Sequence, residues 1–191
     1  METFDPATMS TVSSQCPGGG SINRSKRTSL PNGVTYTVGV TGSYLCIHDV
    51  TESLSERGGA AGMFVATGLV TEPGLKITTS NDGCSANEVC GGRGRMSLTF
   101  SQPVVNPVFS FAGWGGAASG VSWSEMRVVT SGVTMSKLSG TNILVSADGR
   151  YVEDNGQSSS TRCNASTSGS SAVCGSLQLN GTITTVEFEL F

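Results

Sequence analysis

The sequence predicts an all-β fold, an antiparallel β-sandwich of the jelly-roll or Greek-key type with three disulfides. Charged residues make up 13% of the chain and hydrophobic residues 37%, against usual values of about 25% and about 45–50%. Glycine, serine and threonine fill the difference, and this composition favours turns and strands over helices. Two further observations support this fold: short segments in which polar and apolar residues alternate, and an even number of cysteines. A chain of 191 residues is an ordinary length for one all-β domain.

The clearest strand covers residues 34–40. Its period of two places Val34, Tyr36, Val38 and Val40 on one face, and Pro31-Asn32-Gly33 supplies the turn before it. In the last strand Ile183 shares its parity with Thr185, whereas Val186, Phe188 and Leu190 share the other, and this shift is expected to mark where the core-facing register begins. Residues 50–60 show the only helical-turn pattern. The other expected strands are 62–67, 75–79, 95–100, 108–111, 121–129, 133–137, 143–146 and 182–191.

The domain organisation is expected to be simple. Residues 1–28 are polar and glycine-rich and are predicted to form an N-terminal arm, while residues 29–191 form a single domain. The basic cluster Arg24, Lys26 and Arg27 falls in the arm and is interpreted as a solvated surface. The terminal strand over residues 184–191 is typical of a module within a larger chain or fibre.

The six cysteines are Cys16, Cys46, Cys84, Cys90, Cys163 and Cys174. An even number suits an oxidising compartment, although 15 pairings are formally possible. Cys84–Cys90 and Cys163–Cys174 would each close a local loop rich in turn-forming residues, which leaves Cys16–Cys46 to tie the arm to the domain. Zinc is disfavoured because there is no CxxC and the only histidine is His48.

Charge and hydropathy restrict the partners and the location. A net charge of -3 and a pI near 5.1 argue against nucleic-acid binding, which depends on clustered lysine and arginine. No apolar run approaches the ~20 residues that span a bilayer. Residues 1–15 lack a signal-peptide core, so we expect a removed leader or export within a larger chain. Together with the cysteines, these features favour a secreted or cell-surface protein.

A family resemblance lies in the segment Met96-Ser97-Leu98-Thr99-Phe100-Ser101-Gln102-Pro103-Val104-Val105-Asn106-Pro107-Val108-Phe109-Ser110-Phe111. It resembles a strand–turn–strand of β-sandwich domains in large, cell-wall-anchored bacterial surface proteins of the adhesin type. Residues 30–35 and 133–140 are similar to flanking segments of such domains, in the same order. The resemblance implies surface attachment or ligand binding and brings no catalytic residues. Physically, Pro103 and Pro107 end or edge strands, and Asn106 tolerates a turn.

Catalytic motifs are not found, and the sequence predicts a protein that is not an enzyme. Cys46 and His48 would share a strand face, but a disulfide at Cys46 removes the nucleophile. There is no GxSxG and no HExxH. A glycosidase built on two carboxylates stays open as an alternative, as does an internal thioester at Cys46, which lacks its glutamine motif.

Three residues are predicted to contact a ligand. Trp114 lies in a glycine-rich segment that can present it to a sugar ring or a protein partner; the alternative is that it folds back as a plug over one end of the sandwich. Trp123 shares its strand parity with charged residues and should face outward. Asn164 lies in the Ser/Thr-rich loop between Cys163 and Cys174.

No cofactor is expected, with calcium as the weaker alternative. Asp82 and Asp148 stand in turn sequences where carboxylates can bind Ca²⁺ or only stabilise the turn. The sequence thus predicts a non-catalytic, extracellular adhesin domain that binds a glycan or protein on another surface. The alternatives are a fibre subunit assembling through its terminal strand and a carbohydrate-active enzyme or its binding module.

Overall fold

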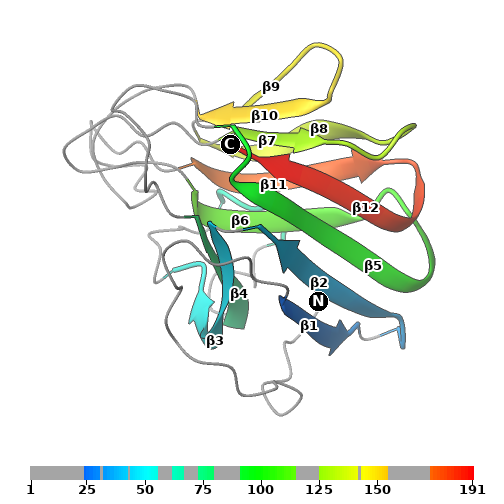
Figure 1. The fold of residues 1–191 in the computed structure, drawn as a ribbon. Coiled ribbons are helices and arrows are strands. Elements are labelled where there is room, and N and C mark those ends of the chain that lie inside the picture. Colours follow the sequence, from blue (N-terminus) through cyan, green and yellow to red (C-terminus); the bar gives the residue numbers. More distant parts are fainter. Residues whose placement is uncertain are drawn as a thin grey trace.

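The computed structural model is all-β in the residues that it describes, with no helix among them (Figure 1). Those residues are 24–30, 32–42, 44–55, 62–66, 73–79, 91–114, 125–141, 143–154 and 173–191. The strands are β1 (Arg24–Ser29), β2 (Thr35–Thr41), β3 (Leu45–Ser53), β4 (Pro73–Thr79), β5 (Gly94–Val105), β6 (Val108–Trp114), β7 (Glu125–Val128), β8 (Thr134–Thr141), β9 (Ile143–Val145), β10 (Tyr151–Asp154), β11 (Val173–Asn180) and β12 (Thr182–Leu190).

The strands form three antiparallel sheets that share one core. A seven-stranded sheet has the order β1-β2-β5-β12-β7-β10-β9, a three-stranded sheet has the order β6-β11-β8, and β3 pairs with β4. One buried cluster joins Val186 and Phe188 of the large sheet to Leu177 of the three-stranded sheet and to Ile47 of β3. The arrangement is therefore sandwich-like, with apolar inner faces packed against each other.

Two connections between the larger sheets are joined to each other by hydrogen bonds. Asn106, at φ 48°, turns the chain from β5 to β6, and Gly181, at φ 132°, turns it from β11 to β12. The Asn106 amide donates to the Gly181 carbonyl at 2.9 Å. The Gly181 amide donates to Asn106 Oδ1 at 2.8 Å. Asparagine and glycine suit this corner because both tolerate positive φ.

The strand β12 shows the predicted shift of parity, but its core-facing residues already begin at Ile183, before the shift. Ile183, Val186, Phe188 and Leu190 are buried, and the pairing register with β5 slips between Ile183 and Thr185. Such an irregularity turns the following residues over to the other face. Pro103 lies where β5 has no registered partner, as expected of a residue without an amide hydrogen.

The structure corrects the expectation that the last strand is an unpaired edge strand. β12 lies between β5 and β7 and pairs with both (Figure 1). Its backbone groups are therefore used within the domain. In the seven-stranded sheet, β1 and β9 are the edge strands instead.

Most of the expected strands are confirmed, but some predictions were wrong. The helical turn is not found where residues 50–60 are described, since β3 continues to Ser53. Residues 62–66 form a turn and bends instead of a strand. The basic cluster expected in the arm belongs to β1, which pairs with β2 along its whole length. The strands β1, β3, β10 and β11 were not predicted.

Residues 62–66 cover part of the outer face of the three-stranded sheet. Met63 and Phe64 are buried against Cys174. The backbone of the same segment is bonded to serines of the sheet, because Ser139 Oγ donates to the Met63 carbonyl at 2.8 Å and the Val65 amide donates to Ser176 Oγ at 3.2 Å. This part of the sheet is closed to solvent.

The cysteine predictions are tested at one position. Cys174 is fully buried in β11 and is disulfide-bonded. No free cysteine occurs in the part of the chain that the structure describes. The three-disulfide pattern and its pairings stay predictions. Among the described residues no helix is long and apolar enough to cross a membrane.

Candidate functional site

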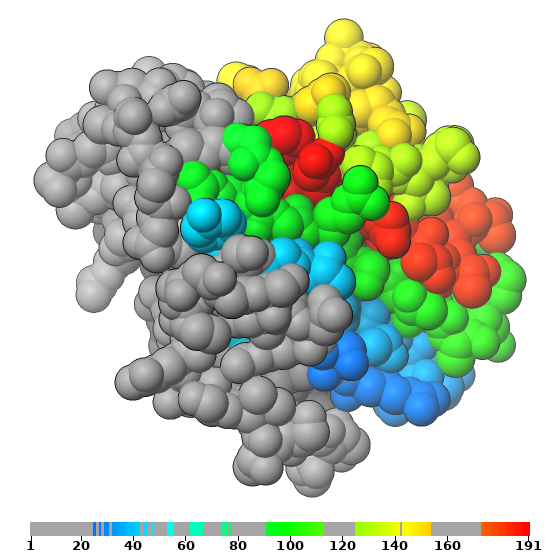
Figure 2. Space-filling view, in the orientation of Figure 1, coloured from blue at the N-terminus to red at the C-terminus, as the bar shows by residue number. Residues whose placement is uncertain are grey.

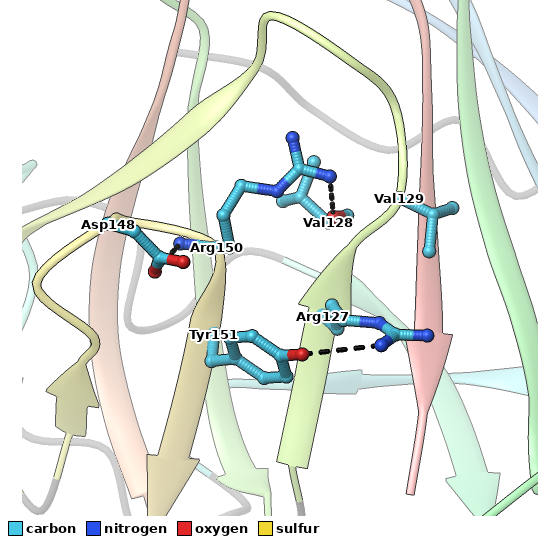
Figure 3. Close-up of a pocket in the computed structure, with 6 residues that line it drawn as sticks. All are labelled: Arg127, Val128, Val129, Asp148, Arg150 and Tyr151. Atoms are coloured by element: carbon cyan, nitrogen blue, oxygen red, sulfur yellow. Dashed lines mark hydrogen bonds between the residues drawn. The ribbon is translucent and has the colours of Figure 1, made fainter.

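A shallow depression lies beside β7 and β10 at the turn that joins β9 to β10. It has a volume of about 370 Å³ and is lined by Arg127, Val128, Val129, Asp148, Arg150 and Tyr151 (Figure 3). We call it the Arg127–Tyr151 trough. Its lining is mainly polar, which suits a hydrophilic ligand.

The alternation of two paired strands brings its main side chains together. On β7, Met126 and Val128 are buried, so Arg127 points to the opposite, outer side of the sheet. On β10, Val152 is fully buried, which turns Tyr151 outward. The register places Tyr151 directly opposite Arg127. Cross-strand neighbours of this kind are close enough for direct contact.

The Arg127 guanidinium is the centre of the trough. Its Nη1 donates to Tyr151 Oη at 3.3 Å, and its Nη2 forms an ion pair with Glu189 of β12. Its Cζ lies 5.8 Å from the ring centroid of Tyr151 and 5.4 Å from that of Phe191. The hydrogen bonds to Tyr151 and then Glu189 raise the pKa of Arg127. Its Nε is buried and has no hydrogen-bond partner among the described residues.

The second arginine of the trough, Arg150, has a structural role. Arg150 Nη1 donates to the carbonyls of Thr130 at 3.0 Å and Val133 at 3.4 Å. Its Nη2 donates to the carbonyl of Val128 (Figure 3). All three carbonyls belong to the passage from β7 to β8, which joins the two larger sheets. Arg150 thus fixes the wall of the trough.

Asp148 stabilises the turn that carries Arg150. Its Oδ1 accepts hydrogen bonds from Ser146 Oγ at 2.5 Å and from the Arg150 amide at 3.0 Å. The bond from Ser146, followed by that from Arg150, lowers the pKa of Asp148. A side chain bonded in this way is typical of an Asx turn.

Carboxylates surround the trough on the same outer face. Glu125 of β7 stands opposite Glu153 of β10 in the pairing register. Burial, and next the charge of Glu153, raise the pKa of Glu125, while Arg127 opposes the shift. On β5, the strand beside β12, Arg95 stands opposite Glu189 in the register and forms an exposed ion pair with Glu187 at 3.7 Å. The face therefore offers both charged donors and charged acceptors.

The predicted ligand residues are only partly described. The backbone of Trp114 ends β6 and pairs with Val173, and nothing is described of its side chain. Trp123, Asn164 and Asp82 lie outside the described residues. Asp148 does line the trough, but its Oδ1 serves the turn. Within the described ranges no three histidine, cysteine or acidic residues are grouped to hold a metal, and the calcium alternative stays a prediction.

Sequence reasoning missed Arg127, Arg150 and Tyr151. Trp123 was predicted to face outward because it shares its strand parity with charged residues, and Arg127 has the same parity. The structure confirms this alternation at Glu125 and Arg127. The strand that carries Tyr151 was not predicted because β10 spans only Tyr151–Asp154, too short for a clear alternation of polar and apolar residues. Comparison with protein-family models, with curated proteins and with solved structures finds no match.

Proposed function

We propose that this chain is a non-catalytic, extracellular adhesin-type domain that binds a glycan on another surface through the Arg127–Tyr151 trough. One observation carries the proposal. Three adjacent strands place a guanidinium, a phenol and a carboxylate in register on the open side of the sheet, as Arg127, Tyr151 and Glu189. Planar charged groups bond pairs of sugar hydroxyls, and an aromatic ring packs on the apolar face of a sugar.

The state of the side chains also supports binding. Arg150 and Asp148 are engaged with backbone groups, so they hold the shape of the trough. Arg127 is fixed by Tyr151 and Glu189 before any ligand arrives, which lowers the entropy lost on binding. A preformed, shallow and polar surface is what an adhesin needs for the end or side of a glycan chain.

The proposal includes the finer points of the fold and its context. The sandwich-like arrangement would be a jelly roll or Greek key with three disulfides, displayed on a bacterial cell surface as part of a larger chain or fibre. The resemblance of residues 96–111 to cell-wall-anchored adhesin domains supports this context. Disulfides suit an exposed, oxidising location.

A glycan array followed by calorimetry on the best ligand tests the function. We expect Tyr151→Ala to weaken binding at least about tenfold, in the range of a lost contact residue, and Tyr151→Phe to retain part of it. Arg27→Ala, an exposed arginine of the edge strand β1 that is separated from β7 by β2, β5 and β12, is the control and should bind normally. Glycan binding that survives Tyr151→Ala and is lost in Trp114→Ala would move the site away from the trough. An array without any signal would overturn the function itself.

A further inference from the structure

Three Asn-Gly pairs occur in the sequence, at Asn32-Gly33, Asn155-Gly156 and Asn180-Gly181. Such pairs can deamidate, because the glycine amide nitrogen reaches the asparagine Cγ without hindrance from a side chain. The reaction requires a side chain that is free to rotate and an accessible backbone amide. Asn32 and Asn180 are described, and they differ in both respects.

Asn32 lies at the exposed tip of the β1–β2 hairpin. Its Oδ1 accepts one hydrogen bond, from the Val34 amide at 3.1 Å. Gly33 has φ 81°, and the space where its Cβ would stand is empty to 4 Å. The Gly33 amide donates to the Leu30 carbonyl at 2.9 Å. Opening this site needs only the fraying of a hairpin tip, a low-energy local motion.

Asn180 is held much more firmly. Its Nδ2 donates to Thr134 Oγ1 at 3.1 Å and to Ser136 Oγ at 2.8 Å, and its Oδ1 accepts from Gln178 Nε2 at 2.8 Å. The following Gly181 amide donates to Asn106 Oδ1. Rotation of the Asn180 side chain would break contacts between β8 and β11, and release of the Gly181 amide would open the corner between the two larger sheets.

We propose that Asn32 is a site of spontaneous deamidation in the folded protein and that Asn180 is protected from it. The Gly33 nitrogen loses its proton and bonds to Asn32 Cγ, and the Cγ–Nδ2 bond breaks to release ammonia. Water then opens the resulting succinimide at either carbonyl, which gives aspartate or isoaspartate. No other reactant is needed.

The product changes the hairpin that carries the edge strand β1. The reaction replaces a neutral amide with an anion, and isoaspartate also adds a methylene to the backbone of the turn. The hydrogen bond from the Val34 amide then loses its geometry. Since β1 is held on one side only, by β2, we expect the modified hairpin to release β1 more readily.

Peptide mapping after incubation at mildly alkaline pH tests the proposal. Trypsin places the three pairs in different peptides, covering residues 28–57, 151–162 and 163–191. In the folded protein we expect deamidation in peptide 28–57 to be at least about tenfold faster than in peptide 163–191, because only the hairpin opens locally. In urea, with the disulfides reduced, the two rates should approach each other because both pairs carry glycine.

A variant sharpens the test. Asn106→Ala removes the acceptor of the Gly181 amide and should speed deamidation of peptide 163–191 while peptide 28–57 keeps its rate. The proposal would be overturned if Asn32 kept its side-chain amide in the folded protein under conditions where it deamidates in the unfolded chain. Equal rates at Asn32 and Asn180 in the folded protein would overturn it as well.

Discussion

The outer faces of the two larger sheets carry polar residues but differ in what covers them. On the three-stranded sheet, Ser176 is fully buried, and its Oγ lies 2.6 Å from Ser110 Oγ under the segment 62–66. On the seven-stranded sheet, the side chains of Arg95 and Glu187 are 57% and 49% exposed. In the surface view of Figure 2, β1, β2, β5 and β12 lie side by side on this open face.

The difference shows how side-chain size decides the use of a sheet face. A serine hydroxyl can be buried at low cost when its hydrogen bonds are made. A guanidinium or carboxylate loses too much hydration to be covered in the same way. The serine-bearing face therefore contributes to stability, and the face with arginine and glutamate stays accessible to a ligand.

The largest effect is expected from Gly175→Ala in the covered sheet. A Cβ at Gly175, which has φ 156°, would stand 2.2 Å from the Ser139 carbonyl oxygen and 2.7 Å from Gly140 Cα. Both are backbone atoms and cannot move away independently. We expect a loss of about 3 kcal/mol in the free energy of unfolding, measured by urea denaturation.

Gly91→Ala is the matched control for this substitution, because no atom lies within 4 Å of its Cβ position. Its free energy of unfolding should stay within about 0.5 kcal/mol of the parent. An equal loss in both variants would mean that the close approach of β8 and β11 is not what restricts position 175.

The next largest effect is expected from Arg150→Lys, which tests the connection from β7 to β8 that joins the two larger sheets. Lysine keeps the charge but places its three donors on one nitrogen, which cannot reach the carbonyls of Thr130, Val133 and Val128 as the arginine fork does. We expect a loss of about 2 kcal/mol by thermal or urea unfolding. Arg95→Lys, at an exposed ion pair, should change stability by less than about 0.5 kcal/mol.

The smallest effect concerns Glu125 on the open face. Burial and the nearby Glu153 raise its pKa in the folded protein, so the folded state holds this proton to a higher pH than the unfolded chain does. Stability should therefore fall as the pH rises from the ordinary carboxyl pKa through the raised one. Glu125→Gln should gain up to about 1 kcal/mol at neutral pH, allowing for solvent screening, and nothing at pH 3. Glu187→Gln, beside Arg95, should show no such gain.

Sequence periodicity predicted the strands whose inner residues are large and whose partners are regular, such as β2 and β12. It failed at β11, where Cys174, Gly175 and Ser176 are buried together with their apolar neighbours. Burial on both sides removes the alternation on which the prediction depends. At β3, acidic and hydroxyl residues gave a helical-turn pattern, and pairing with β4 overrode it.

The trough was predictable only in part, for a related reason. The parity of β7 put Arg127 on the surface, but its neighbours Tyr151 and Glu189 come from strands far away in the sequence. Their meeting depends on β12 lying between β5 and β7. A single sequence gives the direction of a side chain more easily than the identity of the strand beside it.

That position of β12 has a consequence for how the chain acquires its structure. The groups β1-β2-β5 and β7-β10-β9 are joined through β12 alone in the large sheet, and β12 follows both in the sequence. Until residues 182–190 are available, β5 and β7 each present an unsatisfied edge. Folding is therefore expected to be slow and dominated by long-range pairing, with a late step in which one strand closes the gap between two preformed halves.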